Sequence, residues 1–143
     1  MTRFLRCLIA AALLPAFLLV PQLSTAQSSQ ALFDNYLELR ARLDTLMKNR
    51  DIAEVMPLFG DASTPEDLEA LEQRVREIYP QDFENVALIR RQDLEHGFRQ
   101  ELIAYWVGTA YIYVHLLLHQ REDAIIALNF NFNSEFDDLN SKF

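Results

Sequence analysis

Apolar residues recur at helical spacing in the first half of the chain that follows residue 26. Between residues 29 and 49 they are three or four positions apart, and charged residues fill many of the positions between them. The apolar positions of this stretch are Leu32, Tyr36, Leu39, Leu43 and Leu46. The pattern predicts an amphipathic helix over residues 29–49.

Two further helices are predicted before residue 80. Asp51 can cap a short helix that ends at Gly60. Thr64 is a favourable N-cap residue, and Pro65 suits the first helical position that follows it. The third helix therefore begins after Thr64 and ends before Pro80, since proline cannot continue a helix.

From residue 83 onward the pattern changes to that of β-strands. Aromatic and β-branched residues become frequent, and turn signals separate the apolar runs. The predicted strands are 83–93, 98–107, 110–120 and 124–133. Because the connections are short, the strands should form an antiparallel meander. The predicted fold class is α+β, with N-terminal helices packed on one face of a four-stranded antiparallel meander.

The strand pattern also predicts which residues lie opposite one another. A two-residue turn at 108–109 places Trp106 opposite Tyr111. A three-residue loop at 121–123 is favoured in the last hairpin, because a two-residue loop would turn two asparagines toward the aliphatic face. Buried amides without partners cost a few kcal/mol each. With that loop, one face carries Ile112, Val114, Leu116 and Leu118 together with Ile126, Leu128, Phe130 and Phe132.

This register gives the predicted sheet two unlike faces. The aliphatic face should receive the helices. The opposite face, called the second face below, is too aromatic for an ordinary solvated surface and too polar for a core, which is typical of a binding surface. Its candidate binding or interface residues are Leu102, Trp106, Tyr111, Tyr113, His115, Leu117, Asn129 and Asn131. The alternative is that helices or a different register bury this face.

Residues 49–62 read Asn-Arg-Asp-Ile-Ala-Glu-Val-Met-Pro-Leu-Phe-Gly-Asp-Ala. This stretch, together with the order of helices before a meander, resembles the NTF2-like and cystatin-like superfamily of small α+β domains. The resemblance covers about residues 29–133 and implies a curved sheet that often mediates dimerisation. Because the superfamily contains enzymes, binding modules and secreted proteins, the resemblance implies no single function.

The first 26 residues have the three parts of a secretory signal peptide. Arg3 and Arg6 precede an apolar stretch at 7–20, and small residues lead to a cleavage site between Ala26 and Gln27. The apolar stretch is shorter than the roughly 20 residues of a membrane-spanning helix. We therefore expect an exported protein, periplasmic or secreted, with no membrane contact after cleavage. An uncleaved anchor is the alternative.

Removal of residues 1–26 leaves an acidic chain of 117 residues. It keeps 11 basic and 21 acidic residues, a formal charge of −10, and it loses the only cysteine, Cys7. Nucleic acid is itself negatively charged, so it is not an expected partner. The length suits one domain at 27–133, followed by a polar C-terminal tail at 134–143 that is expected to fray.

His115 and His119 are the residues whose spacing is closest to that of a metal site. On a helix they could bind one ion together with Glu122 or Asp123. On a strand they stand about 13 Å apart, which is too far to share an ion. The preceding run at 111–114 favours a strand, so we expect neither a metal nor another cofactor.

Acid–base catalysis is the other enzymatic hypothesis, with His115 or Asp93 beside a tyrosine. The sequence contains no nucleophile motif and no phosphate-binding loop. We therefore favour a non-catalytic exported domain that binds a second copy of itself, a small molecule or another protein. A small enzyme with its pocket between helices and sheet, and a structural accessory subunit, are the alternatives.

Overall fold

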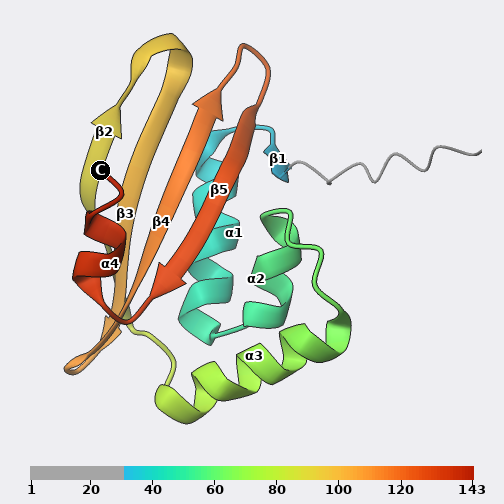
Figure 1. The fold of residues 1–143 in the computed structure, drawn as a ribbon, viewed down its shortest axis with the longest axis vertical. Helices are drawn as coiled ribbons and strands as arrows, with labels where there is room; N and C mark the ends of the chain where they lie inside the picture. The colour runs from blue at the N-terminus through green and yellow to red at the C-terminus, as the bar shows by residue number, and fades with distance from the viewer. Residues whose placement is uncertain (1–30) are drawn as a thin grey trace, which may run out of the picture.

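The computed structural model describes residues 31–143 as an α+β domain, in which helices precede most of an antiparallel sheet (Figure 1). In chain order the elements are β1 Ala31–Phe33, α1 Tyr36–Asn49, α2 Ile52–Leu58, α3 Pro65–Ile78, β2 Asn85–Asp93, β3 Phe98–Val107, β4 Ala110–Gln120, β5 Ile125–Asn133 and α4 Phe136–Asn140. The predicted α+β class is confirmed, but the sheet has five strands rather than four. The predicted signal peptide and its cleavage site lie outside the described residues.

The fifth strand is β1, which occupies residues predicted to begin the first helix. The side chain of Asn35 accepts a 3.0 Å hydrogen bond from the backbone N–H of Glu38, and this cap starts α1 at Tyr36. Before the cap, the chain pairs with β5, with Phe33 buried and Leu32 exposed. Leu32 fits the helical spacing of the sequence although it lies in a strand, so the prediction is wrong at these residues.

Helices α2 and α3 lie where their capping residues predict them. The Thr64 hydroxyl accepts a hydrogen bond from the backbone N–H of Asp67 at 3.3 Å, and Pro65 is the first residue of α3. Arg76 of α3 donates a 2.7 Å hydrogen bond to the carboxylate of Asp51, which precedes α2. This ion pair joins α3 to the start of α2.

The strands are ordered β1-β5-β4-β3-β2, so that β1 and β2 form the two edges of the sheet. The predicted hairpin between β3 and β4 is confirmed. Trp106 pairs with Tyr111, and Leu102 pairs with His115.

The last hairpin differs from its prediction. It turns over residues 121–124, since Gln120 pairs with Ile125, and the predicted three-residue loop is therefore wrong. The register then shifts between β4 and β5, which leaves Leu128 without a paired residue, as in a β-bulge.

This bulge changes which residues of β5 face the core. Beyond it, Phe130 and Phe132 pair with Leu116 and Val114, the residues whose face they were predicted to share. Before it, Ala127 takes a buried position beside β1. A sequence pattern with a strict period of two cannot contain an extra residue, so the predicted face of Ile126 and Leu128 is wrong. Ile126 pairs with His119 and is buried on the second face. Leu128 is 43 % exposed.

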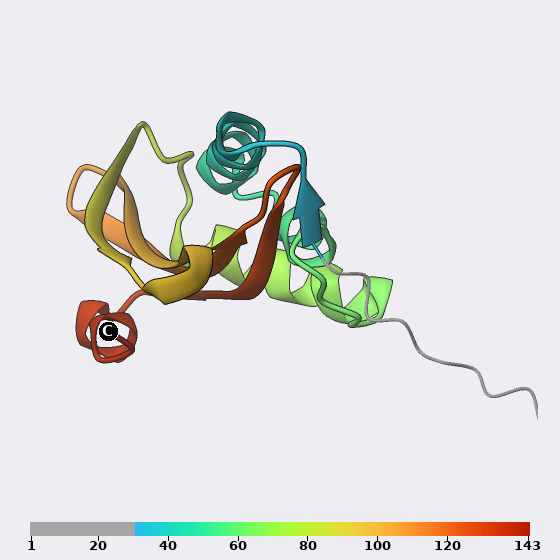
Figure 2. The ribbon, with the colours of Figure 1, turned by 90° about the horizontal axis from the view of Figure 1, so that it is seen from above.

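The elements form three layers, and the sheet is the middle one (Figures 1 and 2). Helices α1 and α2 cover one face, α3 crosses one end of it, and α4 lies on the opposite face. The main core fills the space between the sheet and the first three helices. Its fully buried residues include Phe33, Leu39, Leu43, Met47, Ile52, Ile103, Val114 and Leu116.

The C-terminal residues are ordered rather than frayed. Residues 136–140 form α4, in which Leu139 is only 3 % exposed. This stretch was expected to fray because its composition is polar, but its one leucine is buried. The expectation of a frayed tail is therefore wrong. Among the helices of residues 31–143, none is long and apolar enough to cross a membrane.

Candidate functional site

The second face is divided between covered and open residues. We call residues 134–143 the C-terminal segment. Leu102 and His115, which pair across β3 and β4, are buried, at 0 % and 4 % exposure. Tyr111 is 41 % exposed on the same face. The structure therefore brings the predicted residues onto one face, but not as one uniformly open surface.

Three apolar side chains anchor the C-terminal segment. The ring of Phe136 meets Tyr113 edge-on with centroids 5.5 Å apart, and the ring of Phe143 meets His115 edge-on at 5.4 Å. Leu139, which lies between Phe136 and Phe143 in the sequence, is buried. The three anchors are spaced as residues i, i+3 and i+7, which is the spacing of an apolar helix face. That spacing is the signal by which the sequence could have revealed this docking.

Polar contacts join the same segment to β2 and β3. Arg90 donates a 2.7 Å hydrogen bond to the side-chain oxygen of Asn140, and its guanidinium lies 4.3 Å from the ring centroid of Phe143. Gln100 donates a hydrogen bond to the backbone carbonyl of Lys142 at 3.2 Å. The segment is thus fixed at both its helix and its end.

Four aromatic rings make a continuous series next to the covered region. Trp106 and Tyr111 stack with centroids 5.8 Å apart, and Tyr111 and Tyr113 stack at 6.2 Å. Phe136 continues the series from Tyr113 and is 39 % exposed. We call these four residues the aromatic strip. The sequence prediction found three of them and missed Phe136, because it treated residues 134–143 as a frayed tail.

The remaining predicted residues lie outside the aromatic strip. Asn131 donates a side-chain hydrogen bond to Asn129, its neighbour on the same face of β5. Leu117 pairs with Asn129 across the strands and is half-buried. These residues offer an amide pair beside a leucine, a less apolar surface than the four rings.

His115 is buried without a polar partner. Neither Nδ1 nor Nε2 makes a hydrogen bond to another protein group. Burial lowers the pKa of its imidazole, and the positive charge of Lys142 lowers the pKa further. At neutral pH the ring is therefore uncharged, and no acidic side chain lies beside it as a proton donor.

His119 does not join His115 in a metal site. The segment Ala110–Gln120 is a strand, as predicted, and the ring of His119 stacks on Phe98 with centroids 4.2 Å apart. Within residues 31–143 no group of three or more histidine, cysteine or acidic residues could hold an ion. That the protein binds no metal stays a prediction.

A cluster of charged and tyrosine side chains lies on the opposite, helix-facing side of the sheet. Tyr36 donates a 2.9 Å hydrogen bond to Glu101, which is completely buried. Arg99 lies 2.9 Å from the other oxygen of Glu101, although its N–H is not directed at that oxygen. The guanidinium of Arg99 also lies 4.5 Å from the ring centroid of Tyr36. Sequence reasoning missed this cluster.

The cluster continues along α1 toward Tyr105. Arg40 bonds to Tyr36 at 3.2 Å and to Asp44 at 3.1 Å, and Tyr105 donates a 2.6 Å hydrogen bond to Asp44. Burial first, and Asp44 second, raise the pKa of Tyr105 well above its usual value, and burial raises that of Tyr36. Two arginines therefore balance two carboxylates. This arrangement suits a structural link between α1 and β3.

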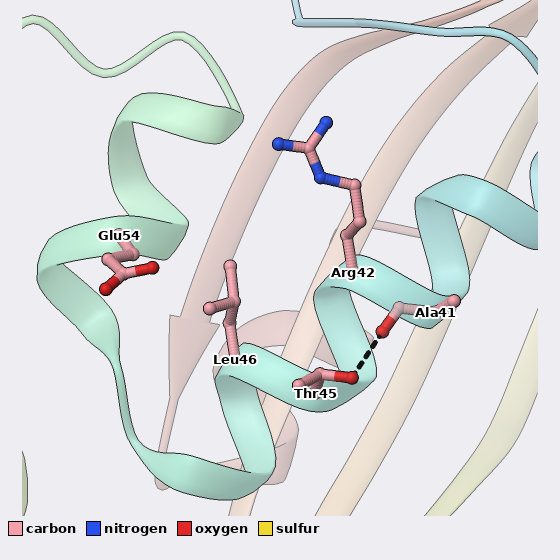
Figure 3. Close-up of a pocket in the computed structure, with 5 residues that line it drawn as sticks. All are labelled: Ala41, Arg42, Thr45, Leu46 and Glu54. Carbon is pink, nitrogen blue, oxygen red and sulfur yellow. Dashed lines mark hydrogen bonds between the residues drawn. The ribbon is translucent and has the colours of Figure 1, made fainter.

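A hollow of about 400 Å³ lies between α1 and α2. Figure 3 shows its lining, in which Arg42, Thr45 and Leu46 of α1 lie near Glu54 of α2. The Thr45 hydroxyl is already engaged, since it donates a 2.8 Å hydrogen bond to the carbonyl of Ala41. The hollow thus combines a mostly apolar wall with two opposite charges, Arg42 and Glu54.

The residues expected to perform acid–base catalysis do not converge. Asp93 accepts hydrogen bonds of 2.8 and 3.0 Å from Arg91 at the exposed end of β2. Hollows of about 210 and 270 Å³ open beside Asp61 and beside Ile112. Asp61 accepts a backbone hydrogen bond from Ser63, and its hydrogen bonds to Ser63 lower its pKa. Neither hollow is lined by His115 or Asp93.

Comparison of the chain with protein-family models, with curated proteins and with solved structures found no match. The likeness to NTF2-like domains therefore rests on the pattern of elements alone.

Proposed function

We propose that this protein is an exported, non-catalytic domain that self-associates through the aromatic strip. The observation that carries the proposal is the continuous series of four rings from Trp106 to Phe136, of which Tyr111 and Phe136 are about two-fifths exposed. Partly exposed aromatic side chains of this kind concentrate near the centres of protein interfaces.

The area of the aromatic strip limits how strongly two copies of the protein can associate. Each aromatic side chain buries roughly 150–250 Å² when fully covered, so the exposed parts of four rings amount to a few hundred Å². A stable interface buries about 800 Å² on each partner. The strip is therefore the centre of a contact that includes neighbouring polar residues, and we expect weak, concentration-dependent association.

A two-fold arrangement also limits the repulsion between two acidic chains. The strip runs from Trp106 at the β3 end to Phe136 on α4. When two strips meet antiparallel, Trp106 of one copy lies against Phe136 of the other. The exposed acidic residues around Phe136, which include Asp137 and Asp138, are then at opposite ends of the contact.

Sedimentation equilibrium over a range of concentrations tests the proposal. Tyr111→Glu places a charge in the centre of the strip and should abolish self-association. Leu37→Glu is the matched control, because Leu37 is 79 % exposed on α1 and its replacement should leave association unchanged. A wild-type protein that stays monomeric at the highest concentration, or equal behaviour of the two variants, contradicts the proposal.

A small enzyme with its site between helices and sheet is the second candidate. The observation in its favour is the buried cluster that contains Glu101 and Tyr105. It ranks second because Glu101 and Asp44 already face arginines, and because the hollows described above are lined by other residues. Catalysis would require an open site beside these groups.

A further inference from the structure

His115 occupies an unusual position beneath the end of the chain. It is 4 % exposed, neither ring nitrogen has a hydrogen-bond partner, and the ring of Phe143 covers it at 5.4 Å. A neutral imidazole can be buried at moderate cost, whereas an imidazolium without an acceptor cannot.

The groups that face His115 would make its protonation still less favourable. From the C-terminal segment comes the cation Lys142, and from β2 comes Arg90, which lies against Phe143. On its own strand and on the neighbouring positions of β3 and β5 the facing side chains are uncharged: Tyr113, Leu117, Leu102, Gln100, Asn129 and Asn131.

No acidic group compensates for these cations. Glu101 neighbours Leu102 in β3, but its side chain lies on the opposite, helix-facing side of the sheet. Asp138 of α4 is engaged with Asn133 at 2.9 Å. Glu135 and Asp137 are exposed, and among the ion pairs of residues 31–143 none involves His115.

We propose that the C-terminal segment is an acid-released cover, which stays docked while His115 is neutral and leaves the second face when His115 becomes protonated. The segment is suited to local release because α4 has only five residues, too few to be stable without its contacts. Its release breaks the contacts of Phe136, Leu139 and Phe143 and leaves the main core untouched, since that core lies on the other side of the sheet.

The direction of the pH effect follows from proton linkage. In the released state His115 is solvated and titrates near 6.5, whereas docking lowers its pKa. Docking is therefore fully favourable above about pH 6.5. As pH falls below that value, the released state binds the proton more readily, and the docking equilibrium weakens by up to about tenfold per pH unit.

Release would expose Leu102 and the protonated His115 and would remove Phe136 from the aromatic strip. Self-association through the strip should therefore weaken at acidic pH, a consequence that rests on the proposed function. The release itself does not, because it depends only on contacts within one chain.

Amide hydrogen exchange followed by NMR tests the release directly in the monomeric concentration range. After correction for the intrinsic rate at each pH, exchange at residues 136–143 should rise up to about tenfold between pH 7.5 and 5.5. His115→Gln removes the titrating group and should abolish this rise. His119→Gln is the matched control and should keep it, as its ring lies on Phe98.

The imidazole titrations provide a second readout that needs no variant. Because burial lowers the pKa of His115, its imidazole should titrate below the ordinary histidine value of about 6.5. Exchange at residues 136–143 that does not change with pH, or an equal rise in His115→Gln, would overturn the proposal. A His115 that titrates at the ordinary histidine value or above it would overturn it as well. A pH-dependent release in a protein that never self-associates would support the cover while contradicting the proposed function.

Discussion

The hydroxyl of Tyr105 donates a 2.6 Å hydrogen bond to the carboxylate of Asp44, and this bond joins the middle of β3 to α1. Tyr105 is completely buried, and its raised pKa keeps the hydroxyl protonated as a donor. Asp44 is held from its other side by Arg40 on the same helix. The position of α1 over the sheet thus depends on a polar link as well as on the apolar core.

Tyr105→Phe should lower the free energy of unfolding by about 2 kcal/mol, because it removes one hydrogen bond to a charged acceptor. Asp44→Leu should cost more, since it leaves a buried hydroxyl without an acceptor and Arg40 without its carboxylate. Urea denaturation of both variants measures the difference. A Tyr105→Phe protein as stable as the wild type would show that the bond contributes nothing net.

The buried pair of Glu101 and Arg99 should behave as a coupled unit. Glu101→Leu leaves a largely buried guanidinium uncompensated, at a cost of about 3–5 kcal/mol. Adding Arg99→Leu to the same chain should restore part of that loss, because the second change removes the uncompensated charge.

The exposed pair of Arg91 and Asp93 is the control for this double-mutant cycle. Their side chains are 46 % and 64 % exposed, so the coupling should be below about 1 kcal/mol. Additive costs for Glu101→Leu and Arg99→Leu in urea denaturation would contradict the coupling expected for the buried pair.

Two glycines in hairpin turns should respond differently to alanine. Both have positive φ angles, +81° at Gly97 and +55° at Gly108, so each replacement costs about 1 kcal/mol in backbone strain. At Gly97 an added Cβ would also lie 2.6 Å from the backbone carbonyl oxygen of Gln120, whereas at Gly108 nothing lies within 4 Å. Gly97→Ala should therefore lower the thermal midpoint clearly more than Gly108→Ala. Equal shifts in a thermal scan would show that the backbone of β4 at Gln120 can move aside at little cost in free energy.

The elements predicted well are those whose side chains follow one regular period. In the hairpin of β3 and β4, alternation and the glycine turn together fix the pairing of Trp106 with Tyr111. The bulge at Leu128 cannot be obtained in this way, because an extra residue breaks the period on which the prediction rests. The three residues of β1 are too few to show any period.

Only part of the candidate site could be predicted, again because the prediction relied on regular alternation. Alternation placed Tyr113 and His115 on one face, but the cover over them comes from Phe136, Leu139 and Phe143, which are spread through a polar stretch. The buried cluster did leave a signal. Alternation along β3 puts Glu101 on the same face as Ile103, so a charge was visible at a core position, although its partners on α1 were not.

Export predicts a defined first residue in the mature protein. Protein recovered from the exporting host should begin at Gln27, because Ser24 and Ala26 supply small side chains to the peptidase. Ala26→Arg should block cleavage, and Ala26→Ser should permit it. Intact mass and N-terminal sequencing distinguish these outcomes, and an intact Met1 on membrane-bound wild-type protein would contradict the signal-peptide hypothesis.

Replacement of Leu139 should raise the pKa of His115, because it releases the segment that covers the imidazole. Leu139 is 3 % exposed at the centre of the C-terminal segment, so Leu139→Ser should release Phe136 and Phe143 along with it. His115 would then be solvated, and its pKa, which burial lowers, should rise toward the ordinary value. Leu128→Ser is the matched control, because Leu128 is 43 % exposed on β5 and its replacement leaves the segment docked. NMR titration of His115 reports both results. If the His115 titration in Leu139→Ser equals that of the wild type, Leu139 does not hold the segment over His115, and the apolar anchors must act independently of one another.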